Sequence, residues 1–246
     1  MAFLQIEFGS NILQGNINIA ILMPNDIKKN ESLKVLYLLH GYSGASLDWI
    51  KQTGIERYIG KYRVMVVMPS MHNSYYCNEA YGYDYFDYYT KELPRFIESS
   101  FNVSNKQEDR YIAGLSMGGY GALKAALTYP NDYHKACSFS GAVDVTRMRS
   151  INQEQPRKNK FDGIFGHEAS TNTQNDLFYL ASKLNQKGPD LYFSCGKQDF
   201  LYQDNLKFKK HLEDLNIPFT YESSDGDHNW VFWDTYIQKA LSFMFD

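Results

Sequence analysis

Hydrophobic residues recur along this chain with two different periods. In 3–8 and 16–23 apolar residues stand at alternate positions, which predicts two strands near the start. Uninterrupted apolar runs follow at 35–39 and 64–68, and such runs are typical of strands buried on both faces of a sheet. The first part of the chain therefore predicts four strands, and the second pair lies at the centre of a sheet.

Helices are predicted between and after these strands. Apolar residues at helical spacing predict helices at 48–62, at 83–101 with a kink at Pro94, in the Ala/Leu-rich stretch after Ser116, at 203–215 and at 231–245. Further short strands are predicted at 111–113, 135–139, 191–194 and 219–222. This order predicts an α/β fold with a mostly parallel sheet, an antiparallel N-terminal start and helices on both faces.

One segment, 144–184, interrupts the alternation. Its centre, 152–160, is polar and basic, which predicts a cap-like surface excursion rather than a separate domain. A chain of 246 residues can bury a large core, and α/β folds of this size are commonly one domain. We therefore expect 1–246 to form a single domain.

Composition and charge narrow the class of partner. A hydrophobic fraction of 43% and a formal charge of −3, without a basic block, argue against nucleic acid. The apolar runs are too short to span a bilayer, and the first residues lack the pattern of a signal peptide. Cys77, Cys137 and Cys195 are odd in number and widely spaced, as expected of reduced thiols in the cytoplasm. These features favour a small-molecule partner, and they leave room for a homo-oligomer.

The stretch around Ser116 carries the strongest chemical signal. A short β-prone run leads into Gly114-Leu115-Ser116-Met117-Gly118, and a helical stretch follows at once. In a sharp strand-to-helix turn of this kind the two glycines let strand and helix pass without Cβ clashes. The serine hydroxyl then lies above the positive end of the new helix, where a developing oxyanion is stabilised. Ser116 is therefore predicted to be a nucleophile.

A nucleophilic serine needs a histidine as base. Three histidines lie well after Ser116: His167, His211 and His228. His211 stands among charged residues of a predicted helix, which indicates a solvated position, and His167 lies in the excursion. His228 follows the last strand in a tight loop, from which it can reach the carboxyl edge of the sheet. His228 is the predicted base.

The acid that orients this histidine must follow an earlier strand. Asp199 and Asp144 both do so. We favour Asp199, because its glycine-containing turn follows the strand immediately before the one that leads to His228. Asp144 remains the alternative. Asp225 and Asp227, beside His228, are predicted to form the turn.

A backbone N–H in 40–44, at the end of the 35–39 strand, together with the N–H of Met117, is expected to hold the oxyanion. His40 itself is expected to be structural. No phosphate-binding glycine loop and no zinc-ligand spacing is present, so neither a cofactor nor a metal is predicted. Trp49 and Trp230 are the expected walls of the substrate pocket.

The chain resembles the tributyrin esterase or esterase D group of α/β-hydrolases, which includes S-formylglutathione hydrolases and acetyl and feruloyl carbohydrate esterases. The residues that carry this resemblance are Tyr37-Leu-Leu-His-Gly41, Asp48-Trp-Ile, Val66-Val-Met-Pro-Ser70, Tyr81-Gly-Tyr-Asp-Tyr-Phe-Asp87, Glu92-Leu-Pro94, Gly114-Leu-Ser-Met-Gly-Gly-Tyr-Gly121, Cys195-Gly-Lys-Gln-Asp199 and Asp227-His-Asn-Trp230. The resemblance implies the α/β-hydrolase fold and a triad of Ser116, Asp199 and His228. It also implies that Tyr42 and Met117 supply the oxyanion N–H groups.

Together these features predict a serine carboxylesterase that acts on short acyl esters through an acyl-enzyme. The basic excursion lacks the long apolar lid of a lipase. Hydrolysis of S-formylglutathione, hydrolysis of acetyl or feruloyl sugars, and acyl transfer are alternatives that use the same acyl-enzyme. A binding protein with an inactive site is disfavoured, because all three triad residues are present in order.

Overall fold

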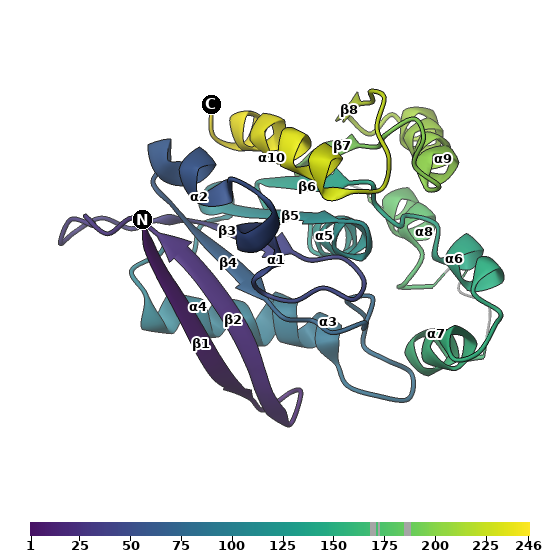
Figure 1. Ribbon diagram of the computed structural model, residues 1–246, viewed down its shortest axis with the longest axis horizontal. Coiled ribbons are helices and arrows are strands. Elements are labelled where there is room, and N and C mark those ends of the chain that lie inside the picture. The colour runs from purple at the N-terminus through teal and green to yellow at the C-terminus, as the bar shows by residue number, and fades with distance from the viewer. Residues whose placement is uncertain (168–170, 172, 185–187) are drawn as a thin grey trace.

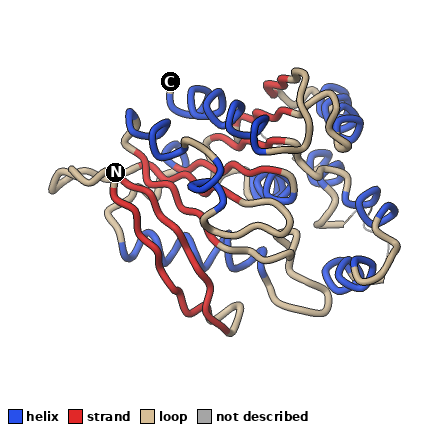
Figure 2. Tube along the Cα trace, in the orientation of Figure 1, coloured by secondary structure: helices blue, strands red, loops and turns tan. Residues whose placement is uncertain are grey.

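The computed structural model describes residues 1–167, 171, 173–184 and 188–246. Its centre is an eight-stranded sheet in the order β1-β2-β4-β3-β5-β6-β7-β8 (Figures 1 and 2). The strands are β1 (Ala2–Ser10), β2 (Gly15–Met23), β3 (Lys34–Leu39), β4 (Val64–Pro69), β5 (Arg110–Leu115), β6 (Lys135–Phe139), β7 (Asp190–Ser194) and β8 (Phe219–Glu222). From β4 to β8 all neighbouring strands are parallel.

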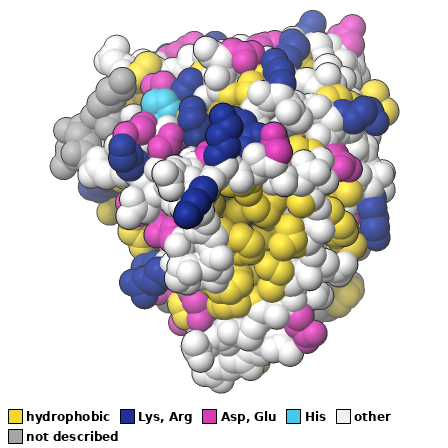
Figure 3. Space-filling model, turned by 90° about the vertical axis from the view of Figure 1, so that its left-hand side faces the viewer, with side chains coloured by type: hydrophobic (Ala, Val, Ile, Leu, Met, Phe, Trp, Pro, Cys, Tyr) yellow, Lys and Arg dark blue, Asp and Glu magenta, His cyan; other side chains and the backbone are white. Residues whose placement is uncertain are grey.

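The two N-terminal strands depart from this parallel arrangement. β1 pairs antiparallel with β2, and β2 pairs antiparallel with β4. β1 therefore forms one edge of the sheet, and its apolar residues Leu4, Ile6 and Phe8 are only half-buried. Figure 3 shows a broad apolar surface on this side of the molecule. The predicted antiparallel start is confirmed.

Two hydrophobic cores lie on opposite faces of the sheet, because successive side chains of a strand point to opposite faces. In β3, Val35, Tyr37 and Leu39 pack on one side, and Leu36 and Leu38 pack on the other. The first face is covered by α4 (Leu93–Ser100), α5 (Met117–Thr128), α8 (Leu177–Ser182) and α9 (Tyr202–Asp214). The second face is covered by α1 (Asp48–Gln52), α2 (Ile55–Tyr58) and α10 (Trp230–Phe245). Helices on both faces of a mostly parallel sheet confirm the predicted fold class.

The prediction of a single helix at 48–62 is wrong. α1 and α2 are separate, and a 3₁₀ turn, Ile59–Lys61, follows α2. The break lies at Thr53, whose backbone is extended and whose hydroxyl accepts the N–H of Ile55. The N–H of Gly54 donates to a carboxylate oxygen of Asp234 in α10, 2.9 Å away. A partner this distant in sequence leaves no local pattern from which to predict the break.

The helix expected at 83–101 is also subdivided. It begins as α3 (Tyr85–Asp87), continues as a π-helical turn (Tyr88–Glu92) and ends as α4. Pro94 lies in the first turn of α4, and it has no N–H to donate to a carbonyl of the preceding turn. A π-helical turn directly before a proline accommodates that missing hydrogen bond.

The excursion at 144–184 contains α6 (Val145–Ile151), α7 (Arg157–Phe165) and α8 within its described residues. α7 is anchored by Phe161 and Phe165, whose rings pack against Tyr75 at centroid distances of 5.1 and 5.6 Å. α6 and α7 lie beyond the carboxyl ends of the strands (Figure 1). No helix formed by the described residues combines the length and the apolar character that a lipid bilayer would require.

Candidate active site

Ser116 lies in the sharp turn between β5 and α5, with φ 52° and ψ −116°. Residues other than glycine rarely adopt this backbone conformation, because a Cβ makes it strained. Three hydrogen bonds hold it: the N–H of Ser116 donates to Phe139, and its carbonyl accepts the N–H groups of Tyr120 and Ala142. The surrounding sheet and helix therefore fix the direction of the Ser116 side chain.

Glycines make the turn sterically feasible. A Cβ at Gly114 would lie 2.4 Å from the backbone of Gly118, and a Cβ at Gly118 would lie 2.6 Å from the carbonyl oxygens of Leu39 and His40. The first turn of α5 therefore rests directly on the end of β3. This contact brings the N-terminus of α5 beside the loop that follows β3.

Replacing Gly118 with alanine is expected to lower the free energy of unfolding by about 1–3 kcal/mol, since the added methyl group would overlap rigid backbone atoms. Denaturant unfolding measures this change. Gly163→Ala in α7 is the matched control, because a Cβ there meets nothing within 4 Å. The control should be neutral or slightly stabilising. Equal destabilisation by both substitutions would contradict the proposed packing.

A continuous chain of hydrogen bonds connects Ser116, His228 and Asp199. His228 Nε2 lies 3.0 Å from Ser116 Oγ, and His228 Nδ1 lies 2.8 Å from Asp199 Oδ2. Rings of Phe200 and Trp233 flank the imidazole at centroid distances of 4.8 and 4.9 Å. The structure thus brings together the three residues predicted as nucleophile, base and acid. His228 is 29 positions from Asp199 and 112 positions from Ser116 in the sequence.

The side chain of Asp199 is fully buried, whereas that of His228 is 20% exposed. Burial alone would raise the pKa of Asp199, but its hydrogen bond to His228, the charge of that imidazole and the N–H of Leu201 together hold the pKa below its usual value. Asp199 is therefore ionised at neutral pH. A carboxylate here fixes Nδ1 as the protonated nitrogen of a neutral His228 and leaves Nε2 free to accept the Ser116 proton.

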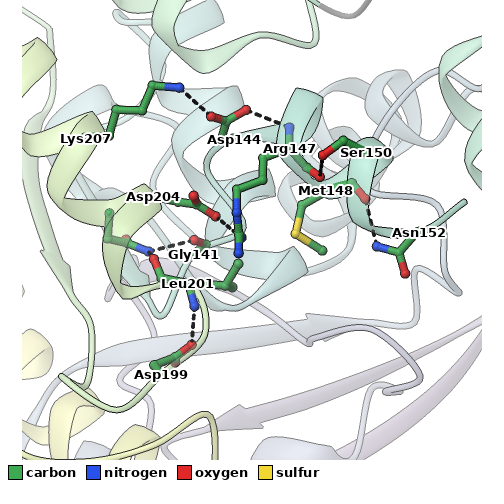
Figure 4. A network of polar contacts seen from close by, with 11 residues as sticks. Gly141, Asp144, Arg147, Met148, Ser150, Asn152, Asp199, Leu201, Asp204 and Lys207 are labelled. Atoms are coloured by element: carbon green, nitrogen blue, oxygen red, sulfur yellow. Dashed lines mark hydrogen bonds and ion pairs between the residues drawn. The ribbon is translucent and has the colours of Figure 1, made fainter.

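Asp144, the alternative acid, has different partners. It caps α6 by accepting the N–H of Arg147, and its second oxygen pairs with Lys207 Nζ at 2.7 Å. Figure 4 shows this pair on one side of the Arg147–Asp204 ion pair and Asp199 on the other. The carboxylate of Asp144 is thus engaged by α6 and α9, and the structure does not bring it to His228.

The other histidines also lie outside the hydrogen-bonded chain. His167 is exposed, 3.9 Å from Asp162. His211 is only half-buried rather than fully solvated, because its Nε2 lies 2.8 Å from the carbonyl oxygen of Phe178 near the start of α8. No three His, Cys, Asp or Glu side chains in the described part of the chain form a group that could hold a metal ion.

His40 is buried and holds the loop after β3 in place. Its Nε2 accepts the N–H of Met71 at 2.8 Å, so Nδ1 carries the proton and donates to the carbonyl of Gly41 at 2.7 Å. Burial, the largest effect, lowers the pKa of His40. The ring is therefore a neutral structural element, as its position in the sequence suggested.

Two amides near Ser116 are free to bind an anion. In the part of the chain that the structure describes, the backbone N–H groups of Tyr42 and Met117 have no hydrogen-bond partner. A Cβ on Gly41, the residue before Tyr42, would lie 3.5 Å from Ser116 Cβ, and Met117 directly follows the serine. Both predicted oxyanion donors thus flank Ser116.

A cavity of about 560 Å³ opens at Ser116 and His228. Trp230, predicted as a pocket wall, lines it. Trp49 does not: it is fully buried, and its indole N–H donates to the carbonyl of Leu39 at 3.0 Å. Trp49 lies behind Trp230, with ring centroids 5.4 Å apart, so it supports the wall from the core. The expectation that Trp49 contacts substrate is therefore wrong.

Most residues of the cavity lining were not predicted from the sequence. Trp233 lies one helical turn after Trp230, and Phe200 directly follows Asp199, so both could have been found from their spacing to predicted site residues. The excursion contributes Met148, Asn152, Arg157 and Phe161. Their polar surroundings in the sequence gave no signal of a pocket.

Several known proteins are similar to this chain in sequence or in structure. The model of a family described as putative esterase matches residues 10–244. An acetyl esterase of Caldicellulosiruptor saccharolyticus is 35% identical and covers 99% of this chain and 98% of its own length.

Two solved structures from Staphylococcus aureus are similar over the same extent. They are the fluorophosphonate-binding serine hydrolase F (TM-score 0.91) and an S-formylglutathione hydrolase (TM-score 0.90). Each is 34% identical in sequence to this chain, and the match covers 99% of this chain and 98% of the other protein's chain. These matches confirm the α/β-hydrolase fold and the resemblance read from the motifs. The chain belongs to the putative esterase family and is a serine hydrolase of carboxylic esters.

Proposed function

We propose that Ser116 is the nucleophile of this esterase, His228 its general base and Asp199 the acid that orients His228. The backbone N–H groups of Tyr42 and Met117 would bind the oxyanion. The single observation that carries this assignment is the unbroken hydrogen-bond chain of 2.8 and 3.0 Å that ends at Ser116 Oγ. A hydrogen-bonded nucleophile, base and orienting carboxylate is the arrangement that activates a serine at neutral pH.

The proposed reaction has two halves. His228 Nε2 takes the proton of Ser116 as Oγ attacks the acyl carbonyl, and Asp199 stabilises the resulting imidazolium. The carbonyl oxygen becomes negative and is bound by the two free amides. The imidazolium then protonates the departing alcohol, which leaves an acyl group on Ser116. Water, deprotonated by His228, releases the acid in the second half.

Short acyl chains are the proposed substrates. The cavity is walled by aromatic rings, including those of Tyr75 and Trp230, and the excursion adds two apolar residues, Met148 and Phe161, beside the polar Asn152 and Arg157. Each methylene buried in such a pocket gains about 0.8 kcal/mol, until the chain meets the wall. Length selectivity should therefore be set by the size of the cavity.

In a series of nitrophenyl esters, kcat/KM is expected to peak between acetyl and butyryl and to fall beyond about six carbons. No activation should accompany the appearance of a lipid–water interface. An optimum at about ten or more carbons would mean that the excursion acts as a lipase lid, and the short-chain proposal would be lost.

Hydrolysis of a thioester is a second candidate. The 34% identity to the structure described as an S-formylglutathione hydrolase favours it, and the proposed acyl-enzyme mechanism would serve it unchanged. Thioester substrates therefore belong in the same kinetic series. Competition between water and an added alcohol acceptor distinguishes hydrolysis from acyl transfer.

We also propose that the protein works in the cytoplasm, because Cys77, Cys137 and Cys195 are all free and buried. Burial raises the pKa of Cys137 and of Cys195, so these thiols are inert rather than nucleophilic. The single-domain organisation of 1–246 and the homo-oligomer that the composition allows remain predictions.

A further inference from the structure

Arg157, the first residue of α7, is a cation that lines the cavity beside Ser116. Its guanidinium Nη1 donates to Asn152 Oδ1 at 3.2 Å, and its Cζ lies 5.9 Å from the ring centroid of Tyr42. Both partners are uncharged. Within the described residues no carboxylate lies within ion-pair distance of Arg157.

The other basic residues of α6 and α7 are all ion-paired, and Asp162 is shared by two of them. Each has a carboxylate within 4.0 Å, and the pairs are Arg147–Asp204, Arg149–Asp162, Lys158–Asp162 and Lys160–Glu79. Arg157 differs from all of them, because its charge faces the cavity without a counter-charge from the described residues. An arginine has five N–H donors, and only one of them has a hydrogen-bond partner among the residues that the structure describes.

Arg157 is exposed to solvent, and its guanidinium lies beside Asn152 and the ring of Tyr42. Asn152 is buried, and its amide N–H donates to the carbonyl of Met148 at 2.7 Å, which turns Oδ1 toward Arg157. The ring of Tyr42 is the second neighbour, 5.9 Å from Cζ of Arg157. A planar fork held in this way suits a carboxylate, which it can bind with two parallel hydrogen bonds.

Asp48 is the other charged residue of the lining. Its carboxylate accepts the N–H of Ala45 at 3.0 Å on the α1 side of the cavity, whereas Arg157 stands on α7 (Figure 1). The cavity therefore carries opposite charges on two different elements. An anionic group of a substrate would be repelled from the α1 side and attracted to the α7 side.

We propose that Arg157 selects esters that carry a carboxylate, by binding that carboxylate while Ser116 attacks the acyl group. The inference rests on the proposed function, since it assigns the substrate class of the same site. The carboxylate can stand on the acyl part or on the alcohol part of the ester. The two placements are separate arms of the test.

The test compares matched substrates on the same protein. In the acyl arm, the 4-nitrophenyl monoester of succinic acid is compared with 4-nitrophenyl butyrate, whose acyl chain has equal length. In the alcohol arm, 4-acetoxybenzoate is compared with its methyl ester. Spontaneous hydrolysis is subtracted, and the readout is the ratio of kcat/KM for the anionic substrate to kcat/KM for the neutral one.

In at least one arm Arg157→Gln should lower this ratio about tenfold, as expected for the loss of a charge-assisted hydrogen bond at a partly exposed site. Arg157→Lys keeps the charge but loses the fork, so its ratio should lie between those of the wild type and Arg157→Gln. Added salt should lower the wild-type ratio toward that of Arg157→Gln. Lys158→Gln is the matched control: it removes the neighbouring positive charge, which pairs with Asp162, and should leave the ratio unchanged.

An unchanged ratio in both arms would overturn the inference. An equal fall in Arg157→Gln and Lys158→Gln would overturn it as well, because it would indicate a general effect of surface charge. In either case, neutral esters that are still cleaved in a Ser116-dependent manner would leave the proposed function intact. Loss of that dependence would instead refute the proposed function.

Discussion

Replacement of Ser116 with alanine is expected to lower kcat for ester hydrolysis by about 10⁵- to 10⁶-fold. The hydroxyl is the only group of the hydrogen-bond chain that can form the acyl-enzyme, and His228 would have no proton to accept. A small rate above that of water should persist, since the two free amides would still stabilise an oxyanion formed by direct attack of water. Steady-state kinetics on a short nitrophenyl ester measures this loss.

Ser138→Ala is the matched control. Ser138 is also a buried serine, in the neighbouring strand β6, and its Oγ has no hydrogen-bond partner among the described residues. Its replacement should change kcat by less than about threefold, because it removes no hydrogen bond to the described residues. If Ser116→Ala kept most of its activity, or if Ser138→Ala lost as much, the assignment of the nucleophile would be refuted.

Replacement of Asp199 with asparagine is expected to lower kcat by about 10⁴-fold. An amide at this position can donate to Nδ1 of His228, which would place the imidazole proton on Nε2 and block acceptance of the Ser116 proton. The substitution also removes the negative charge that stabilises the imidazolium. Asparagine has nearly the same shape as aspartate, so the loss of activity reports the change in charge and tautomer rather than a change in packing.

Asp144→Asn is the control for the choice between the two acids. It weakens the ion pair with Lys207, whose side chain is 65% exposed, and such pairs contribute only about 1 kcal/mol or less to stability. Activity should therefore fall only slightly. If Asp144→Asn were the more damaging substitution, the orienting acid would have to be reassigned to Asp144.

The order of strands and helices was predictable because the buried faces of these elements produce local patterns of apolar residues in the sequence. The apolar run of β3 and the alternation in β1 directly encode two-sided and one-sided burial. The break between α1 and α2 was not predictable. It depends on Asp234, which lies 180 positions away from Gly54, and no pattern within 48–62 reports that contact.

The same contrast holds for the site. Ser116, His228 and Asp199 follow strand ends, and the carboxyl ends of parallel strands meet at one edge of the sheet, so their proximity could be inferred from chain order. Trp49 was misplaced because a tryptophan beside a motif can face either the cavity or the core. Arg157 was grouped with other basic residues, since only the three-dimensional structure distinguishes a charge that has a carboxylate partner from one that has none.

Reaction with a fluorophosphonate probe, which modifies activated serines, locates the reactive nucleophile of this protein. The protein is labelled, digested and analysed by mass spectrometry. One modified peptide that contains Ser116 is expected, and Ser116→Ala should not be labelled. Labelling of another residue in the wild type, or undiminished labelling of Ser116→Ala, would contradict the assignment of Ser116 as the nucleophile.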